Sequence, residues 1–253
     1  MTTRIYDSLA ERKKSGRKSF AVLIDPDHTF DPGKLSRIIT NAVQYRADFF
    51  FVGGSYFLEN NIRECIEIIK KNCSIPVILF PGNVSHIDYN ADAILFLSLI
   101  SGRNPDYLIG QHVIAAPGLK KRGTEVIPTG YILIDGGRTS TVSYISFSNP
   151  IPQDQPGLAA ATALAGEMPG LRLAYLEAGS GAIHPVSEKV IGQVSAMISI
   201  PLIVGGGINT PEKASAAYRG GADMIVVGNK IDMFPEFIGE IAAIKDGFDG
   251  TKG

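Results

Sequence analysis

The chain has 253 residues, of which 45% are hydrophobic, and its 24 lysines and arginines nearly balance its 25 aspartates and glutamates. Because both signs of charge are spread along the chain, it has no overall field that would attract nucleic acid or an anionic membrane. The length suits a single domain over residues 1–253, and an eightfold α/β barrel is the commonest fold of that size.

The N-terminal segment, residues 1–18, carries six basic residues but lacks the apolar core that a signal peptide needs. We expect it to form an extra, solvated helix ahead of the barrel, on a soluble, cytoplasmic protein. No apolar run approaches the ~18 residues that cross a bilayer, which excludes a membrane span. Cys65 and Cys73 lie eight residues apart on one expected helix, a spacing that indicates plain buried or half-buried thiols.

Eight short apolar runs follow one another along the chain, and each is apolar on both faces, as in a parallel sheet covered by helices. Helical patterns lie between several of them; Asp31-Pro32 and Thr210-Pro211 are strong helix starts, and we expect two more at His184-Pro185 and Phe234-Pro235. This alternation predicts a (β/α)8 TIM barrel, with an open doubly wound sheet as the alternative. The runs are residues 20–24, 48–52, 75–80, 93–97, 131–134, 173–177, 201–205 and 223–228.

Two connections depart from this regular alternation. Residues 82–92 are too few for a crossover helix, so we predict an irregular crossover after the third strand. His86 and Asp88 fall in that short polar loop, where we expect them to be solvated. Residues 139–152 alternate polar and apolar side chains with few charges, which indicates an extra strand or an apolar-lined lid.

Polar and glycine-rich clusters follow seven of the eight runs. In a parallel barrel the residues that do chemistry lie at the C-terminal ends of the strands, where the following loops meet over one face. We therefore expect these clusters to form one active site. They are residues 25–28, 53–55, 81–83, 135–138, 177–181, 205–207 and 228–229.

The glycines after the last two strands do not fit a dinucleotide site, because Thr210 stands where the third glycine of G-x-G-x-x-G belongs. A phosphate fits better, since Gly205 and Gly206, with Gly228 and Asn229, let backbone N–H groups approach an anion closely. The alternative is that these glycines only form tight turns.

Tyr175 and Glu177 alternate at the end of the sixth run, so we expect both side chains to point into the mouth of the barrel. Glu177 is then placed to accept a proton from a bound hydroxyl. Gly179, Ser180 and Gly181 follow directly and form a small-residue nest with a hydroxyl, which suits an anion. The alternative for Glu177 is a strand-end glutamate in a salt bridge.

Asp25 and Asp27, after the first run, are oxygen ligands of the kind that Mg²⁺ takes, together with substrate phosphates. We rank Asp25 first because it is nearer the strand, while Asp27 alternatively caps a turn. Ser55, after the second run, could approach the same ion or a phosphate. The histidines lack the spacing of a zinc site.

These clusters resemble the geranylgeranylglyceryl phosphate synthase family. The resemblance implies a Mg²⁺-dependent prenyltransferase on a TIM barrel, which joins sn-glycerol 1-phosphate to geranylgeranyl diphosphate through an ether. By that likeness Asp25 and Ser55 would hold the metal and Glu177 would take the hydroxyl proton. The motifs are LIDPD (23–27), FVGGS (51–55), PGN (81–83), SLISGRNPDYLIGQHV (98–113), YLEAGSGA (175–182), VGGGI (204–208) and VVGN (226–229). The residues implied to contact glycerol phosphate are Tyr175, Glu177, Ala178, Gly179, Ser180, Gly181, Gly205, Gly206, Gly228 and Asn229.

The resemblance also implies an apolar groove for the prenyl chain and a homo-oligomer, and the lipid product suggests peripheral contact with a membrane. One branch of the family carries a lysine where this chain has Leu23, which indicates the other branch. Whether Asp27 or His28 assists at the diphosphate stays open. Open alternatives for the function are a longer donor such as heptaprenyl diphosphate, another phosphate-binding TIM-barrel isomerase or lyase, and a prenyl- or phosphate-binding carrier.

Overall fold

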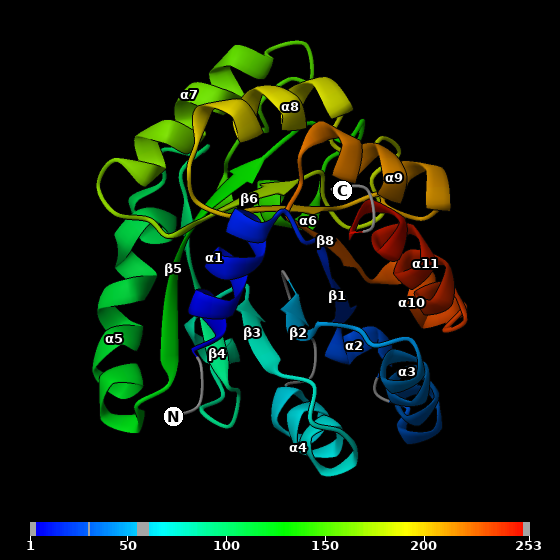
Figure 1. Cartoon of the computed structure of the whole chain (residues 1–253). Coiled ribbons are helices and arrows are strands. Elements are labelled where there is room, and N and C mark those ends of the chain that lie inside the picture. Colours follow the sequence, from blue (N-terminus) through cyan, green and yellow to red (C-terminus); the bar gives the residue numbers. More distant parts are fainter. Residues whose placement is uncertain (1–3, 30, 55–60, 250–253) are drawn as a thin grey trace.

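Eight parallel strands close into a barrel in a computed structural model that describes residues 4–29, 31–54 and 61–249. Each strand pairs with its neighbours in sequence, and β8 closes the ring against β1. The predicted TIM barrel is confirmed (Figure 1). The strands are β1 (Ser19–Ile24), β2 (Phe49–Gly54), β3 (Val77–Pro81), β4 (Ala93–Leu99), β5 (Glu125–Leu133), β6 (Leu173–Glu177), β7 (Leu202–Gly205) and β8 (Met224–Val227).

All eight predicted strands are present, but β5 begins six residues earlier than residues 131–134 indicated. Pro128 and Gly130 interrupt the apolar pattern of its first half, which hid that half in the sequence. The strand nevertheless pairs with β4 over seven residues, from Glu125 to Tyr131. The side chains of Ile100 and Leu171 pack closely over Gly130, where a Cβ would lie 2.8 Å from Ile100 Cδ1.

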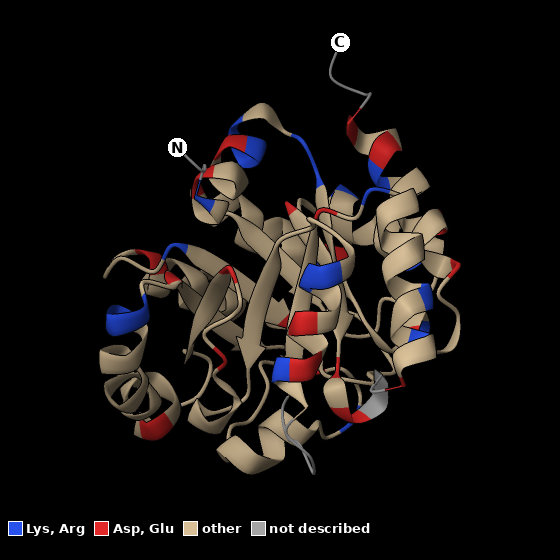
Figure 2. Ribbon diagram, turned by 90° about the horizontal axis from the view of Figure 1, so that it is seen from below, with Lys and Arg blue, Asp and Glu red and all other residues tan. Residues whose placement is uncertain are grey.

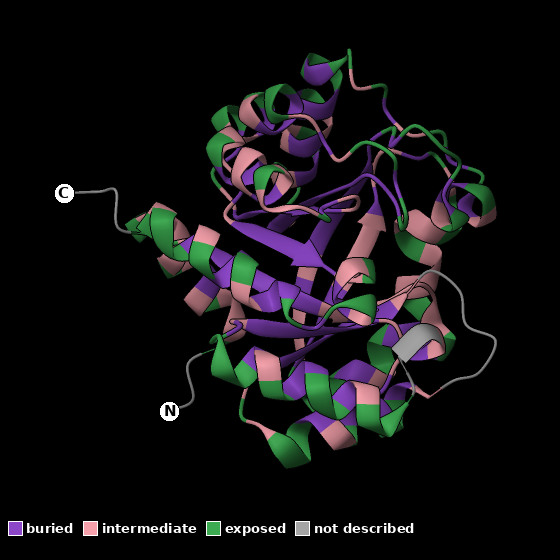
Figure 3. Cartoon of the chain, turned by 90° about the vertical axis from the view of Figure 1, so that its right-hand side faces the viewer, coloured by how far each residue is buried: buried purple, intermediate pink, exposed green. Residues whose placement is uncertain are grey.

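The strand side chains form two apolar layers, one inside the barrel and one between the barrel and its helices. Phe49 and Phe51 point into the barrel, whereas Phe50 belongs to the outer layer. All three are buried, as a strand covered on both faces requires. Figure 3 shows the buried strands inside a shell of helices whose outer faces are exposed, and Figure 2 shows the charged residues mainly on those helices and on loops.

Four of the described helices begin at a side chain that accepts a hydrogen bond from the first turn: α3, α6, α8 and α9. Asp31 accepts from the Lys34 N–H and Thr210 from the Lys213 N–H, so both predicted starts are confirmed. The other two expected starts are wrong by two or three residues: α8 begins after its cap Ser187, and α11 begins at Phe237. The helices are α1 (Ile5–Ser15), α2 (Pro26–Thr29), α3 (Pro32–Gln44), α4 (Ile62–Asn72), α5 (Gln111–Arg122), α6 (Thr141–Ser146), α7 (Pro156–Glu167), α8 (Glu188–Met197), α9 (Pro211–Gly220), α10 (Asn229–Met233) and α11 (Phe237–Asp249).

The predicted extra N-terminal helix is present as α1, which covers the end of the barrel where the strands begin (Figure 1). Leu9 enters the barrel interior, and Lys13 pairs with Asp223 just before β8. Arg12 reaches Asp48, just before β2, at 2.8 Å. This end of the barrel is therefore closed, which leaves the opposite end for a site. Among the described helices, none is long and apolar enough to cross a bilayer.

The connection between β3 and β4 contains only a 3-10 turn, η1 (Val84–His86), so the predicted irregular crossover is confirmed. The expectation that His86 and Asp88 are solvated is wrong. His86 is buried and accepts from the Gly82 N–H, and burial lowers its pKa to about 4. Asp88 is buried against Arg63. The short connection folds inward because no crossover helix covers this part of the barrel.

The prediction of an extra strand within residues 139–152 is wrong, because the segment forms the short helix α6. The Ser140 hydroxyl caps it by accepting from the Ser143 N–H, and the Ser140 N–H donates in turn to the Ser143 hydroxyl. Ile151 makes a single bridge to Ile134, the only strand-like pairing of this segment within the described residues.

Candidate active site

A polar cavity of 430 Å³ opens at the C-terminal ends of the strands, where the sequence predicted a site. It is lined by residues that follow β1, β6, β7 and β8, together with side chains of β3 and β5. Two of the predicted clusters contribute less: residues 81–83 line a neighbouring apolar cavity, and residues 135–138 line neither cavity. The lining includes Leu23, Asp25, Asp27, Phe80, Tyr131, Tyr175, Glu177, Gly179, Ser180, Gly181, Gly206, Gly228, Asn229, Lys230 and Asp232.

Glu177 is the last residue of β6, and its side chain is 7% exposed. The Gly179 N–H donates to its Oε1 at 2.7 Å, and the Tyr175 hydroxyl lies beside the carboxylate. Burial raises the pKa of Glu177 to about 7, because these two neutral donors compensate only part of the lost hydration. A carboxylate that titrates near neutral pH is suited to accept and release a proton.

The alternative of a salt bridge at Glu177 is wrong: no lysine or arginine pairs with it among the described residues. Tyr175 lies fully buried inside the barrel, two residues earlier on the same face. Burial, and then the nearby carboxylate, hold the pKa of Tyr175 well above its usual value, so its hydroxyl stays a donor. The alternation predicted from the sequence therefore brings these two groups together.

The glycines after β6 and β7 allow the loops to touch the carboxylate. Gly206 has φ 83°, and a Cβ there would lie 2.7 Å from the Gly179 nitrogen and would collide with Glu177. A Cβ at Gly205 would lie 2.9 Å from Glu177 Oε2. Glycine is required at Gly206 by both its backbone conformation and this close approach, and at Gly205 by the close approach alone.

Gly205 and Ala178 lie behind the cavity wall rather than on it. The Ala178 N–H donates to the Gly205 carbonyl at 3.1 Å, which joins the ends of β6 and β7. Gly206, Gly179 and Gly181 lie on the wall. The first pair therefore holds the loops together, whereas the three glycines of the wall face the cavity.

Ser180 and Asn229 link the loop after β6 to the first turn of α10, with Ser180 Oγ 3.2 Å from the Asn229 amide nitrogen. Gly228 precedes that turn and packs against Leu23, whose side chain would be 3.2 Å from a Cβ. Lys230 follows, and its ammonium lies 4.3 Å from the centre of the Phe234 ring. Among the described residues of the cavity wall, Lys230 is the one basic side chain.

Asp25 and Asp27 both line the polar cavity on the side of β1. Asp25 Oδ1 accepts from the Asp27 N–H at 3.1 Å, so Asp25 rather than Asp27 supports the start of α2. Ser55 lies outside the described residues, as does the side chain of His28. Within the described part of the chain no cluster of three or more acidic, histidine or cysteine side chains suits a metal. The two aspartates are still enough for Mg²⁺, which takes one or two carboxylates beside substrate phosphates.

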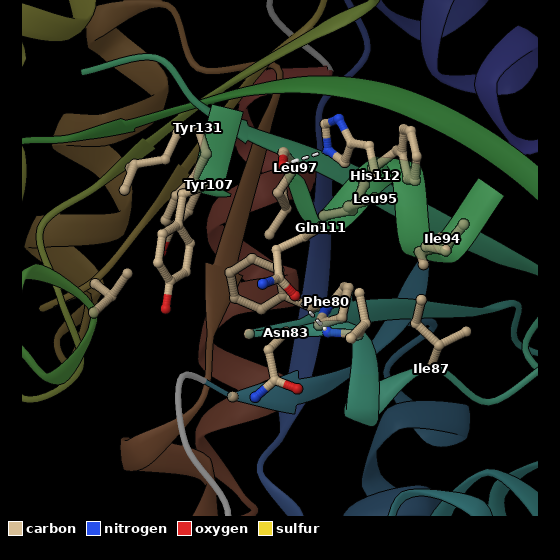
Figure 4. A pocket seen from close by; sticks show the side chains of 18 of the residues that line it. Phe80, Asn83, Ile87, Ile94, Leu95, Leu97, Tyr107, Gln111, His112 and Tyr131 are labelled. Atoms are coloured by element: carbon tan, nitrogen blue, oxygen red, sulfur yellow. Dashed lines mark hydrogen bonds between the residues drawn. The ribbon is translucent and has the colours of Figure 1, made fainter. Parts of the chain in front are cut away.

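A narrow apolar cavity of 80 Å³ adjoins the polar one, between the C-terminal ends of β3, β4 and β5 (Figure 4). Its floor and sides come from the short β3–β4 connection, from α5 and the preceding π-helical turn η2 (Asp106–Gly110), and from α6. His112 lines it as a neutral ring, because burial lowers its pKa and it stacks on Phe96. The lining includes Phe80, Val84, Ile87, Leu95, Leu97, Leu99, Tyr107, His112, Tyr131, Val142 and Ile145.

Sequence reasoning missed Lys230 and most of the apolar side chains of this cavity, although residues 81–83 and the motif 98–113 contribute to its wall. No helix crosses between β3 and β4, and the wall of the cavity combines residues of four strands with residues of the β3–β4 connection, of η2 and α5, and of α6. The short connection and the apolar alternation of residues 139–152 were the available signals. Val142 and Ile145 of that segment do line the cavity, but from a helix.

Comparison with known proteins identifies relatives of the whole chain. The PcrB family profile matches residues 12–246. The geranylgeranylglyceryl phosphate synthase of Spirosoma linguale is 54% identical over 236 residues, covering 93% of this chain and 94% of that protein. The synthase of that name from Chitinophaga pinensis is 50% identical over 242 residues, covering 96% of each chain.

Among solved structures, (S)-3-O-geranylgeranylglyceryl phosphate synthase from Thermoplasma acidophilum, in complex with its substrate sn-glycerol-1-phosphate, superposes with a TM-score of 0.90. That protein is 35% identical, and the alignment covers 97% of this chain and 100% of the other. The barrel, the order of the motifs and these matches agree. The chain belongs to the PcrB family of geranylgeranylglyceryl phosphate synthases.

Proposed function

We propose that this protein is a geranylgeranylglyceryl phosphate synthase, which joins sn-glycerol 1-phosphate to geranylgeranyl diphosphate through an ether bond. The observation that carries the proposal is the pair of adjoining cavities: one polar, with a buried carboxylate, and one apolar and narrow. A small phosphate ester and a prenyl diphosphate need this combination. The names of the relatives and the substrate named for the T. acidophilum structure support it.

In this reaction the glycerol phosphate lies on the side of β6, β7 and β8. Gly206 and Gly228 let backbone N–H groups approach its phosphate, and Ser180 with Asn229 offers polar side chains. Lys230 adds the positive charge that a lysine at the position of Leu23 would supply in the other branch of the family. Gly205 and Ala178 act indirectly, by holding the two loops together.

Glu177 acts as the general base. It accepts the proton of the attacking glycerol hydroxyl, and Tyr175 positions the carboxylate from inside the barrel. The phosphate anchor holds the hydroxyl near the reacting carbon, so that a bimolecular attack becomes an intramolecular one. A pKa of about 7 lets Glu177 take the proton and return it to solvent after each turnover.

Asp25 would hold Mg²⁺ with the diphosphate, and Asp27 lies close enough on the cavity wall to assist. Ser55 is proposed as a further ligand from its motif alone. When bound, the ion would offset the negative charge that the departing diphosphate gains. The carboxylates of this wall suit such a hard cation and leave its remaining positions to phosphate oxygens and water.

The first part of the prenyl chain enters the apolar cavity. We propose geranylgeranyl as the donor, with heptaprenyl as the longer alternative. We further propose a single-domain, cytoplasmic homo-oligomer that touches membranes only peripherally, to deliver its lipid product.

The test is incubation of the protein with labelled sn-glycerol 1-phosphate, Mg²⁺ and prenyl diphosphates of increasing length. We expect a labelled ether lipid with the C20 donor, no product from sn-glycerol 3-phosphate, and loss of turnover when EDTA removes the metal. No product with any donor would sink the proposal, whereas faster turnover of the C35 donor would reassign the chain length alone.

A further inference from the structure

Two aromatic residues line both cavities at once: Phe80, near the end of β3, and Tyr131, on β5. Their ring centres are 5.9 Å apart in an edge-to-face arrangement. Tyr175 stacks on Phe80 with ring centres 5.3 Å apart and an angle of 10° between the planes. Phe80 is 9% exposed and Tyr131 6% exposed. The rings therefore form a buried aromatic wall at the boundary between the polar and the apolar cavity.

This boundary is where the reacting carbon must lie if the proposed function holds. The diphosphate belongs beside Asp25 and Asp27 of the polar cavity, through the Mg²⁺ that they would hold, and the hydrocarbon tail belongs in the apolar cavity. The allylic carbon joins these two parts of the donor. It is therefore held at the only surface that the two cavities share within the described residues, which consists of Gly54, Phe80, Tyr131 and Val142.

We propose that the Phe80 and Tyr131 rings stabilise the positive charge that develops on this allylic carbon. In the transfer, the bond between C1 and the diphosphate oxygen breaks, and its electron pair leaves with the diphosphate. The glycerol oxygen forms the new bond to C1, and its proton passes to Glu177. Between these events C1 and the far carbon of the allyl group share positive charge, which the faces of aromatic rings attract.

Aromatic rings suit this position better than further carboxylates. A carboxylate in direct contact with the allylic carbon would compete with the glycerol oxygen as a nucleophile, whereas a phenyl ring does not react with the carbon and excludes water from it. The attraction between a cation and a ring is largest where both are desolvated, and both residues are almost fully buried. Tyr175, whose ring centre lies 5.3 Å from that of Phe80, stacks on this ring and holds it in place.

The experiment compares two unreactive analogues of geranylgeranyl diphosphate. One carries an ammonium nitrogen at the position of the allylic cation, and the other is the thiolodiphosphate, which has the same shape without the charge. Phe80 is replaced by pentafluorophenylalanine, which keeps the ring but removes its negative face. We expect the affinity for the ammonium analogue to fall about 10-fold and the affinity for the thiolodiphosphate to change less than about twofold.

Phe51 provides the matched control, since it lies in the same interior cluster against Phe80 but lines neither cavity. Pentafluorophenylalanine at Phe51 should leave both affinities unchanged. Tyr131→Phe should keep the preference for the ammonium analogue, and Tyr131→Leu should weaken it. Equal losses for both analogues, or no loss at Phe80, would overturn the inference.

The inference rests on the proposed function, and the two fail separately. If the unmodified protein makes no ether lipid from any prenyl donor, the proposed function is wrong. If it makes the product, and the fluorinated Phe80 variant keeps both its turnover and its preference for the ammonium analogue, only the role of the aromatic wall is wrong.

Discussion

Two glutamates, one at each end of the barrel, are the only charged residues of the eight described strands. Glu125 begins β5 and accepts hydrogen bonds from the backbone N–H groups of Ile5 and Tyr6, the first turn of α1. Glu177 ends β6 and faces a cavity from a buried position. A glutamate thus helps to close one end of the barrel, and at the other end a glutamate is the base of the proposed reaction.

The difference lies in what surrounds each carboxylate. At the closed end, ion pairs such as Arg12 with Asp48 and Lys13 with Asp223 surround the helix that Glu125 caps. At the open end, Glu177 is buried beside two neutral donors, and its pKa rises to about 7. Stability is concentrated where the strands begin, and reactivity where they end.

The largest expected effect comes from removing the charge of Glu177. Glu177→Gln keeps the shape and the hydrogen bond from Gly179 but cannot accept a proton, so turnover should fall by about 10²-fold or more. Steady-state kinetics with sn-glycerol 1-phosphate and a prenyl diphosphate measures this loss. Unchanged turnover in a folded variant would contradict the role of Glu177 and leave water as the base.

The pH dependence of activity and stability tests the same carboxylate without mutation. Turnover should fall as the pH drops below about 7, because protonated Glu177 cannot act as a base. Its folded pKa exceeds the ordinary value of 4.5, so the folded state binds the proton more tightly than the unfolded state does. The stability from this group is present below pH 4.5 and is lost as the pH rises through about 7.

The stability of Glu177→Gln relative to the original protein should therefore increase as the pH rises from 4.5 to 7. The rise in the pKa of Glu177 from 4.5 to about 7 corresponds to about 3 kcal/mol of unfolding free energy. The original protein loses this amount relative to Glu177→Gln at the alkaline end of the range. Urea unfolding of both proteins across this pH range measures the difference. A difference that does not change with pH would show that burial does not penalise the ionised form.

A smaller loss should follow from Gly206→Ala, which changes the contact between the phosphate loop and the base. The new Cβ combines a strained positive φ with a collision against Glu177 and Gly179. We expect KM for glycerol phosphate to rise about 10-fold and turnover to fall, since a displaced anchor misplaces the hydroxyl. Kinetics at varied glycerol phosphate concentration separates the two effects.

Gly123→Ala is the matched control for that change. Gly123 ends α5 with φ 72°, but no atom lies within 4 Å of a Cβ there. Its strain should lower the free energy of unfolding by about 1 kcal/mol and leave KM unchanged. If both variants gave the same KM, the close approach at Gly206 would have no functional role.

The sequence predicted the open end of the barrel better than its apolar side. Glu177 and Tyr175 were predictable because alternation along one strand determines which face a side chain takes. The burial of His86 was not predictable, because its partners, Gly82 and Asn83, adopt their positions only when the β3–β4 connection folds inward. The aromatic boundary formed by Phe80 and Tyr131 likewise joins two strands that are distant in the chain.

The smallest effect is expected at the closed end, from Glu125→Gln. The neutral amide can still accept one N–H from Ile5 or Tyr6, but it loses the charge that favours a helix N-terminus, which should cost about 1 kcal/mol of stability. The ion pair with Arg4 adds little, because the atoms are 3.9 Å apart and Arg4 is mostly exposed. Turnover should stay within about twofold of the original value, since the barrel separates the two glutamates.

Glu11→Gln, on the exposed part of the same helix, is the control and should change neither the stability nor the turnover. If Glu125→Gln lost more turnover than its lower stability explains, α1 would affect the site. The two ends of the barrel would then not be independent.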